Sequence, residues 1–219
     1  MKNRVIVFAN QKGGAGKSTL CTFFANYLAW KNKKVCIIDT DLQQTITALR
    51  KDDLEFYGCE PPYPIQGFPV ADPEDMQQLM QNAREFDGYV LIDTPGNLNQ
   101  DGLLPLLINA DYIVCPFRYD KPTVSSTGTF IKTLRKVREK FPGMRAKLLF
   151  APNNINRKGN LEEKKAWKQS ANLFEMFGEV LPVVPSRAAL ERVNTIEVIS
   201  SQRELVQDCF EKIINLTSE

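Results

Sequence analysis

The chain has 219 residues, of which 43% are hydrophobic and 25% charged, and its formal net charge is +2. This composition excludes a disordered tail, and so weak a positive charge does not by itself require a nucleic-acid partner. Five cysteines without any C-x-x-C pair argue against a disulfide framework and the usual zinc spacing, so we expect a reducing cytoplasm. No apolar run reaches the roughly 18 to 20 residues of a membrane span, and no signal peptide is evident. We expect residues 1–219 to form a single domain.

A glycine-rich loop follows the first predicted strand. Residues 5–8 are all apolar, as in a buried parallel strand, and residues 11–18 (QKGGAGKS) then predict a turn that leads into a helix. Gly13, Gly14 and Gly16 would let several backbone N–H groups approach one anion closely. The positive end of the following helix would point at the same anion. The stretch therefore predicts a phosphate-binding loop.

The end of this loop supplies the side chains that phosphate chemistry needs. Lys17 would reach the β- and γ-phosphates of a nucleotide, and the Ser18 hydroxyl would ligate Mg²⁺. The general pattern G-x-x-x-x-G-K-[ST] is met at Gly16 but not at its first position, which is Gln11. A second lysine, Lys12, precedes the glycine pair.

The stretch KGGAGKST resembles the deviant Walker A motif of the ParA/MinD ATPases. The resemblance implies that Lys12 crosses a dimer interface and touches the nucleotide of the partner subunit. Gln11 stands where the septum-placement and iron-sulfur branches typically have Gly, so the match favours the partition ATPases. ATP and Mg²⁺ are the implied cofactors. The loop residues expected to hold the nucleotide are Lys12, Gly13, Gly14, Ala15, Gly16, Lys17, Ser18 and Thr19.

Apolar residues at helical spacing predict a helix over residues 20–28, and residues 35–38 predict a second buried strand. That strand delivers Asp39 and Asp41 to its carboxyl end, where open α/β sheets bind ligands. IIDTDLQQT resembles the family's switch I, which implies that Asp41 orients or activates the attacking water and that Asp39 supports Mg²⁺ and the loop geometry. Leu42 replaces the usual proline of that motif. On spacing alone, these acids could instead cap a turn.

Residues 51–73 are hard to interpret, because five prolines break any helix there. We expect a short strand within residues 65–70 and a helix over residues 72–86. Residues 89–92 form a further apolar run that ends at Asp93, the arrangement in which a carboxylate holds Mg²⁺. VLIDTPG is also similar to the family's switch II.

The second half predicts a short helix over residues 103–107, a strand over 110–117, a helix over 127–141 and a strand over 147–151. A helix beyond residue 161 and a last strand over residues 180–184 follow. The resemblance implies that Asn153 or Asn154 contacts the adenine. It also implies that the backbone of Pro185 lies against the purine ring.

Residues 203–216 place apolar side chains along one side of a final helix. A septum-placement ATPase would use such a helix as a membrane anchor, which normally needs a basic polar face. The polar face here mixes acidic and basic residues, so we expect the helix to dock on the core and no membrane partner.

These motifs together predict an α/β fold, a single-domain P-loop NTPase with a mostly parallel twisted sheet and helices on both faces. The resemblance implies an Mg²⁺-dependent ATPase that forms an ATP-sandwich homodimer, binds DNA non-specifically and segregates DNA. A ParB-like centromere-binding protein would stimulate hydrolysis, and the protein would associate with the nucleoid. The alternative is an ATP-switched positioning or adaptor protein for a protein complex, without DNA cargo.

Three groups of basic residues could contact DNA, although a solvated helix face is the commoner meaning of such residues. They are the face of the 132–140 helix, the group Arg157, Lys158, Lys164, Lys165 and Lys168, and Arg187 with Arg192.

Overall fold

The computed structural model describes residues 3–97, 101–156 and 158–218. Its strands are β1 (Arg4–Phe8), β2 (Val35–Asp39), β3 (Ile65–Gly67), β4 (Tyr89–Asp93), β5 (Tyr112–Phe117), β6 (Lys147–Pro152) and β7 (Glu179–Val180). Its α-helices are α1 (Lys17–Trp30), α2 (Thr45–Tyr57), α3 (Pro73–Glu85), α4 (Leu103–Asn109), α5 (Lys121–Lys140), α6 (Leu161–Glu175) and α7 (Ser200–Ser218). A 3₁₀ turn, η1 (Ala188–Glu191), precedes the last helix.

The seven strands form one sheet in the order β3-β2-β4-β1-β5-β6-β7, and every pairing is parallel. The register sets Asp93 beside Phe8 on one neighbouring strand and beside Asp39 on the other. Because parallel strands end at the same edge, β1, β2 and β4 deliver their last residues to one place. The two acidic residues therefore lie side by side, both on the β4 side of the loop that follows β1.

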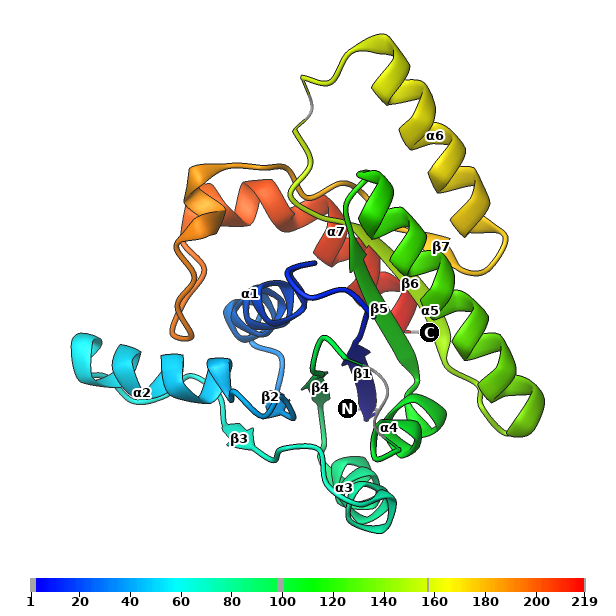
Figure 1. Cartoon of the computed structure of the whole chain (residues 1–219). Coiled ribbons are helices and arrows are strands. Elements are labelled where there is room, and N and C mark those ends of the chain that lie inside the picture. The colour runs from blue at the N-terminus through cyan, green and yellow to red at the C-terminus, as the bar shows by residue number, and fades with distance from the viewer. Residues whose placement is uncertain (1–2, 98–100, 157, 219) are drawn as a thin grey trace.

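Successive side chains of each strand point to opposite faces, and both faces are covered by helices (Figure 1). One apolar cluster contains Ile6 and Phe8 of β1 with residues of α1, α2 and α7. The other contains Val5 and Val7 with residues of α3, α4, α5 and α6. The prediction of an α/β fold with helices on both faces is confirmed.

The C-terminal helix α7 docks on α1. Val206, Cys209 and Phe210 are fully buried, and the Phe210 ring centroid lies 5.1 Å from that of Phe24 on α1. The apolar side of α7 is thus part of the core in this structure. Within the described ranges, no helix is both long enough and apolar enough to cross a membrane.

Several element boundaries differ from the sequence-based expectation. Helix α2 extends through residues 51–57, where we expected proline to prevent a helix; the prolines begin only at residue 61. Strand β7 ends at Val180, not at residue 184, although the backbone N–H groups of Leu181 and Val184 still donate hydrogen bonds to the carbonyls of Phe150 and Pro152 on β6. Helix α5 begins six residues earlier than expected, at Lys121, because the Asp120 side chain accepts a hydrogen bond from the backbone N–H of Thr123.

Candidate nucleotide-binding site

The glycine loop between β1 and α1 has the backbone conformation that only glycine adopts readily. Gly14 and Gly16 have φ values of +72° and +93°. A Cβ atom on Gly16 would lie 2.1 Å from the side-chain nitrogen of Asn153, which donates a hydrogen bond of 3.1 Å to the carbonyl of Ala15. Asn153 therefore holds the loop from the β6 side of the sheet.

Lys17, the first residue of α1, is buried against this loop. Burial lowers the pKa of its amine, and the nearby carboxylates of Asp93 and Asp41 oppose that shift. Gly96, which follows β4, covers the loop: a Cβ there would lie 3.2 Å from Gly13 Cα and 3.7 Å from Lys17 Nζ. The segment after β4 thus touches both the glycines and the amine of the predicted phosphate site.

Ser18 and Asp93 are in direct contact. The Ser18 hydroxyl donates a hydrogen bond of 2.6 Å to Asp93 Oδ2. Burial raises the pKa of Asp93 to about 7, the charges of Asp39 and Asp41 add to this shift, and Ser18 and Lys17 oppose it. The structure therefore brings two of the three predicted metal ligands together.

Asp39, the third predicted ligand, is fully buried at the end of β2. Its Oδ2 atom accepts hydrogen bonds from the backbone N–H groups of Ile46 and Thr47, both at 3.0 Å, and from the Thr47 hydroxyl at 3.1 Å. This carboxylate therefore accepts hydrogen bonds from backbone N–H groups in the first turn of α2, which have no partner within the helix. Its second oxygen, Oδ1, has no hydrogen-bond partner among the described residues. Asp39 thus has the capping role that its spacing in the sequence left open, and its Oδ1 atom remains available to a ligand.

Unpartnered buried oxygens gather at this edge of the sheet. Among the described residues, the buried side-chain atoms without a hydrogen-bond partner are Asn10 Oδ1, Gln11 Oε1, Asp39 Oδ1 and Asp93 Oδ1. All four residues end a strand or begin the loop after β1. Buried polar atoms are nearly always paired, so an unpaired group of this kind calls for a ligand. Oxygen ligands, with one or two carboxylates, are what Mg²⁺ uses beside a nucleotide, so these residues fit that ion.

Asp41 and Lys12 lie nearer to solvent. Asp41 is partly exposed and its Oδ1 accepts a hydrogen bond of 2.9 Å from the backbone of Gln43, while its charge reaches Lys17 and Asp93. Lys12 is exposed and forms no ion pair with any described residue of its own chain. The predicted roles of both residues in hydrolysis stay predictions.

A cavity of about 310 Å³ opens beside the loop. Asn153, Asn154 and Pro185, the residues expected at the base, all line it together with Gly14 and Thr19 of the loop region. A parallel bridge between Ile155 and Pro185 fixes this wall. The cavity is thus adjacent to the phosphate loop, where a base attached to the phosphates would lie.

Sequence reasoning missed two residues of this site. Asn10 is fully buried, and its amide donates to the Pro116 carbonyl at 2.7 Å and to the Thr127 hydroxyl at 3.1 Å, joining the loop to α5. Arg118 lines the cavity and pairs with Asp120 at 2.9 Å. Asn10 could have been found, because a polar residue just after a buried strand is typical of a site at the edge of the sheet. The position of Arg118 depends on tertiary packing, so the local sequence does not predict it.

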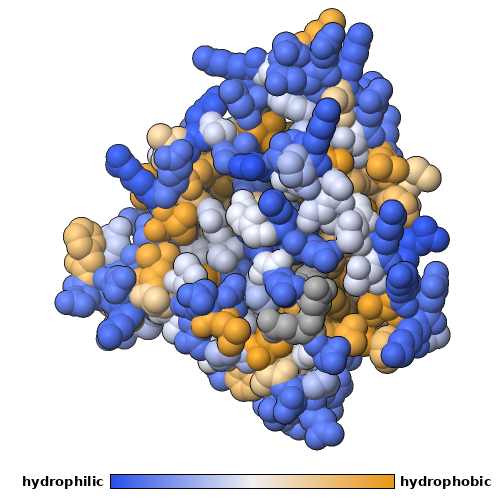
Figure 2. Space-filling model, in the orientation of Figure 1, coloured by the Kyte–Doolittle hydropathy of each residue, from blue (hydrophilic) through white to orange (hydrophobic). Residues whose placement is uncertain are grey.

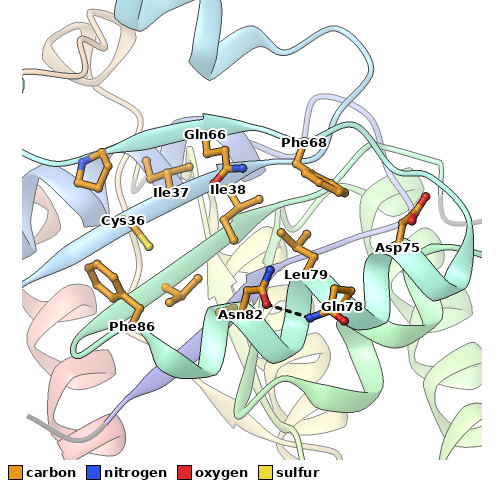
Figure 3. Close-up of a pocket in the computed structure, with 13 residues that line it drawn as sticks. Cys36, Ile37, Ile38, Gln66, Phe68, Asp75, Gln78, Leu79, Asn82 and Phe86 are labelled. Carbon is orange, nitrogen blue, oxygen red and sulfur yellow. Dashed lines mark hydrogen bonds between the residues drawn. The ribbon is translucent and has the colours of Figure 1, made fainter.

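A second cavity, of about 370 Å³, lies between the β2-β3 edge of the sheet and α3 (Figure 3). Figure 3 shows Ile38, Leu79, Phe68 and Phe86 around it, with Gln78 hydrogen-bonded to Asn82. Its described lining includes neither glycine nor a cation, so it is not a candidate for binding a phosphate.

The chain is similar in sequence to known nucleotide-binding proteins, among them ATPases. Residues 6–197 match the family model described as the CobQ/CobB/MinD/ParA nucleotide binding domain. The "Maintenance of carboxysome distribution protein A" of Gloeobacter kilaueensis is 32% identical over 115 residues, covering 52% of this chain and 48% of that protein. The "Chromosome-partitioning ATPase Soj" of Thermus thermophilus is 29% identical over 163 residues, covering 63% and 64%. The chain therefore spans about half to two thirds of these relatives' lengths.

The fold is also similar to that of solved structures. A putative plasmid partition protein of Borrelia burgdorferi B31, bound to AMPPNP, aligns with a TM-score of 0.68 at 18% identity. The alignment covers 99% of this chain and 100% of that one. At this level of identity the likeness shows the fold alone.

Proposed function

The chain belongs to the CobQ/CobB/MinD/ParA nucleotide-binding family, and on that premise we propose that it is an Mg²⁺-dependent ATPase of the partition type. Two copies would enclose two ATP molecules between their loop edges, and hydrolysis would separate them. The Soj relative supports this choice within the family.

The observation that carries the proposal is the set of unpartnered buried oxygens beside the glycine loop. Asp93 and Asp39 each keep one free oxygen there, and the Ser18 hydroxyl is 2.6 Å from Asp93. These three residues would hold Mg²⁺, which supplies positive charge to the phosphates when bound. Lys17 would neutralise the phosphates from the helix side, and the glycine backbone would cradle them.

Two residues nearer to solvent complete the proposed reaction site. Asp41 lies within electrostatic reach of Lys17 and would hold the attacking water through its carboxylate. Lys12 forms no ion pair with the described part of its own chain, which leaves its amine available to the γ-phosphate of a second copy. Its charge would stabilise the transition state in the way an arginine finger does.

The proposed cargo is DNA. In this account the ATP-bound dimer binds DNA without sequence preference over the nucleoid, and a ParB-like centromere-binding protein stimulates hydrolysis. Release of the dimer from DNA would follow hydrolysis, so that ATP turnover is coupled to movement.

Light scattering with Mg²⁺ and ATP tests the dimer, and phosphate release tests the reaction. Wild type should double in mass with ATP, and Lys12→Ala should lose hydrolysis. The matched control is Lys33→Ala, a lysine just before β2 and therefore at the opposite edge of the sheet. If Lys12→Ala dimerises and hydrolyses ATP like Lys33→Ala, the proposed role of Lys12 is wrong.

A second candidate function is ATP-switched positioning of a protein assembly. The relative named for carboxysome distribution favours it. Retention of the ATP-bound protein by DNA, measured in parallel with its retention by the assembly, separates the two candidates. The first function requires binding to DNA, whereas an adaptor for a protein assembly requires binding only to that assembly.

A further inference from the structure

A strongly basic surface covers the C-terminal half of α5 and the segment that follows it. Its seven cations, here called the α5 basic surface, are Lys132, Arg135, Lys136, Arg138, Lys140, Arg145 and Lys147. All seven side chains are exposed, and Glu139 is the single acidic residue between positions 132 and 147. Lys132, Arg135, Lys136 and Lys140 recur at spacings of three and four residues, so these four cations share one face of the helix.

This positive charge is not neutralised by ion pairs among the described residues. None of the seven cations forms an ion pair with a residue that the structure describes. Arg138 donates a hydrogen bond to the Ala146 carbonyl, and Lys140 lies over the Phe141 ring at 5.6 Å, but neither contact removes charge. The surface therefore presents a concentrated positive potential to solvent.

The other basic groups considered for DNA contact differ from it. On α6, three lysines are accompanied by three glutamates, so that helix carries no net charge. Arg187 lines the cavity beside the glycine loop together with Glu191, and Arg157 lies outside the described residues. The α5 basic surface is the group in which cations clearly outnumber acids.

Topology places this surface away from the nucleotide. Helix α5 begins at Lys121, just after the carboxyl end of β5, and its 20 residues return about 30 Å to the other edge of the sheet. It ends near Lys147, the first residue of β6. Figure 1 shows α5 crossing the right of the molecule, and Figure 2 shows hydrophilic side chains over its lower end. A second copy covering the glycine loop would leave this end exposed.

We propose that the α5 basic surface binds the phosphate backbone of duplex DNA. The inference rests on the proposed function and names the surface that the cargo touches. Lysine and arginine contacts to phosphates carry no sequence information, so such binding is non-specific. An ATP-bound dimer presents two copies of the surface, and the second contact is then intramolecular, which strengthens retention when ATP is present.

The test compares two double variants of equal spacing. Lys132→Ala with Lys136→Ala removes two exposed charges from α5, and Lys164→Ala with Lys168→Ala removes two from α6 at the same interval. Affinity for a duplex of arbitrary sequence is measured with ATP and Mg²⁺ at several salt concentrations. The α5 variant should bind about tenfold more weakly or worse. The slope of its log affinity against log salt concentration should be shallower by about 3.6, because the dimer loses four cations, while the α6 variant binds like wild type.

Light scattering and phosphate release on the same samples separate this inference from the proposed function. Equal DNA affinity of the α5 variant and wild type, with dimerisation intact, would overturn the inference alone. The same holds if the α5 variant loses binding to phosphatidylglycerol vesicles and not to DNA. A wild type that forms the ATP dimer yet binds no duplex would overturn both the inference and the proposed DNA cargo. Absence of the ATP dimer would overturn the proposed function, and weaker DNA binding by the α5 variant would still support the surface.

Discussion

Two buried polar clusters in this chain differ in how completely their hydrogen bonds are satisfied. The first, here called the α2 clamp, consists of Arg50 and Asp53 on α2 and Thr195 in the segment before α7. Arg50 donates to the hydroxyl and carbonyl of Thr195 at 2.8 and 2.9 Å and to the Tyr63 carbonyl at 2.7 Å. Asp53 Oδ2 accepts from the backbone N–H and hydroxyl of Thr195 at 2.6 and 2.7 Å.

The second cluster is the edge around the glycine loop, where Asn10, Gln11, Asp39 and Asp93 each keep an oxygen without a partner. No buried atom of the α2 clamp is left in that state. A polar cluster satisfied internally holds two segments of the chain together, whereas an unsatisfied one is unfavourable until something binds. We infer that the α2 clamp stabilises the fold and that the cluster around the glycine loop binds the ligand. Substitutions in the clamp should therefore lower stability, and substitutions around the loop should weaken nucleotide binding.

The largest expected effect is on nucleotide binding by Lys17→Ala. This substitution removes the cation of the proposed phosphate site, and we expect affinity for ATP to fall about 1000-fold, equivalent to about 4 kcal/mol. Because burial already lowers the pKa of this amine, its loss should leave the melting temperature of the nucleotide-free protein nearly unchanged. Calorimetric titration with ATP and a thermal melt check the two halves of the prediction.

Next in size is the effect of Asp53→Ala on stability. It leaves the N–H and hydroxyl of Thr195 without their acceptor in a buried site, and we expect the free energy of unfolding to fall by about 3 kcal/mol. Asp52→Ala, an exposed neighbour on the same helix, is the matched control and should change it by less than about 0.5 kcal/mol. Equal urea midpoints for the two variants would contradict the structural role of the clamp.

Asp93→Asn should stabilise the nucleotide-free protein. The folded state raises the pKa of Asp93 from 3.8 to about 7, so between these values it keeps a proton that the unfolded chain releases. The free energy of unfolding therefore falls as pH rises through this window. In chelator, the variant should exceed wild type by a few kcal/mol at pH 8 and match it near pH 4. A variant less stable than wild type at pH 8 would show that the fold stabilises the ionised carboxylate, which contradicts a raised pKa.

The smallest effect is expected where α7 meets α1. Glu211 accepts a hydrogen bond from Tyr27 and pairs with Lys31, both at 2.6 Å. Partial burial alone would raise the pKa of Glu211, but these two partners outweigh it and hold the pKa below 4.5. Its contribution is therefore present at neutral pH and lost as the pH falls through that lowered value. Glu211→Gln should cost less than about 1 kcal/mol at pH 7, measured by urea unfolding.

The sequence alone predicted the parts of the site that are local in the chain. The apolar runs before Asp39 and Asp93, and the glycines after β1, carry their own periodicity and spacing, and the structure brings them to one edge of the sheet. Helix α2 was missed because it buries few residues and its start depends on the Asp39 carboxylate, six residues away. The α2 clamp joins residues 145 positions apart, a distance at which local pattern carries no information.

The central claim is that each copy lends Lys12 to the nucleotide of the other. Mixing inactive Lys12→Ala with inactive Asp41→Ala in the presence of ATP and Mg²⁺ tests it through phosphate release. If Lys12 acts across the dimer, each mixed dimer contains one intact site, and about a quarter of wild-type hydrolysis should return. If the mixture stays as inactive as its two components while mixed dimers form, Lys12 acts on its own subunit's nucleotide or not at all.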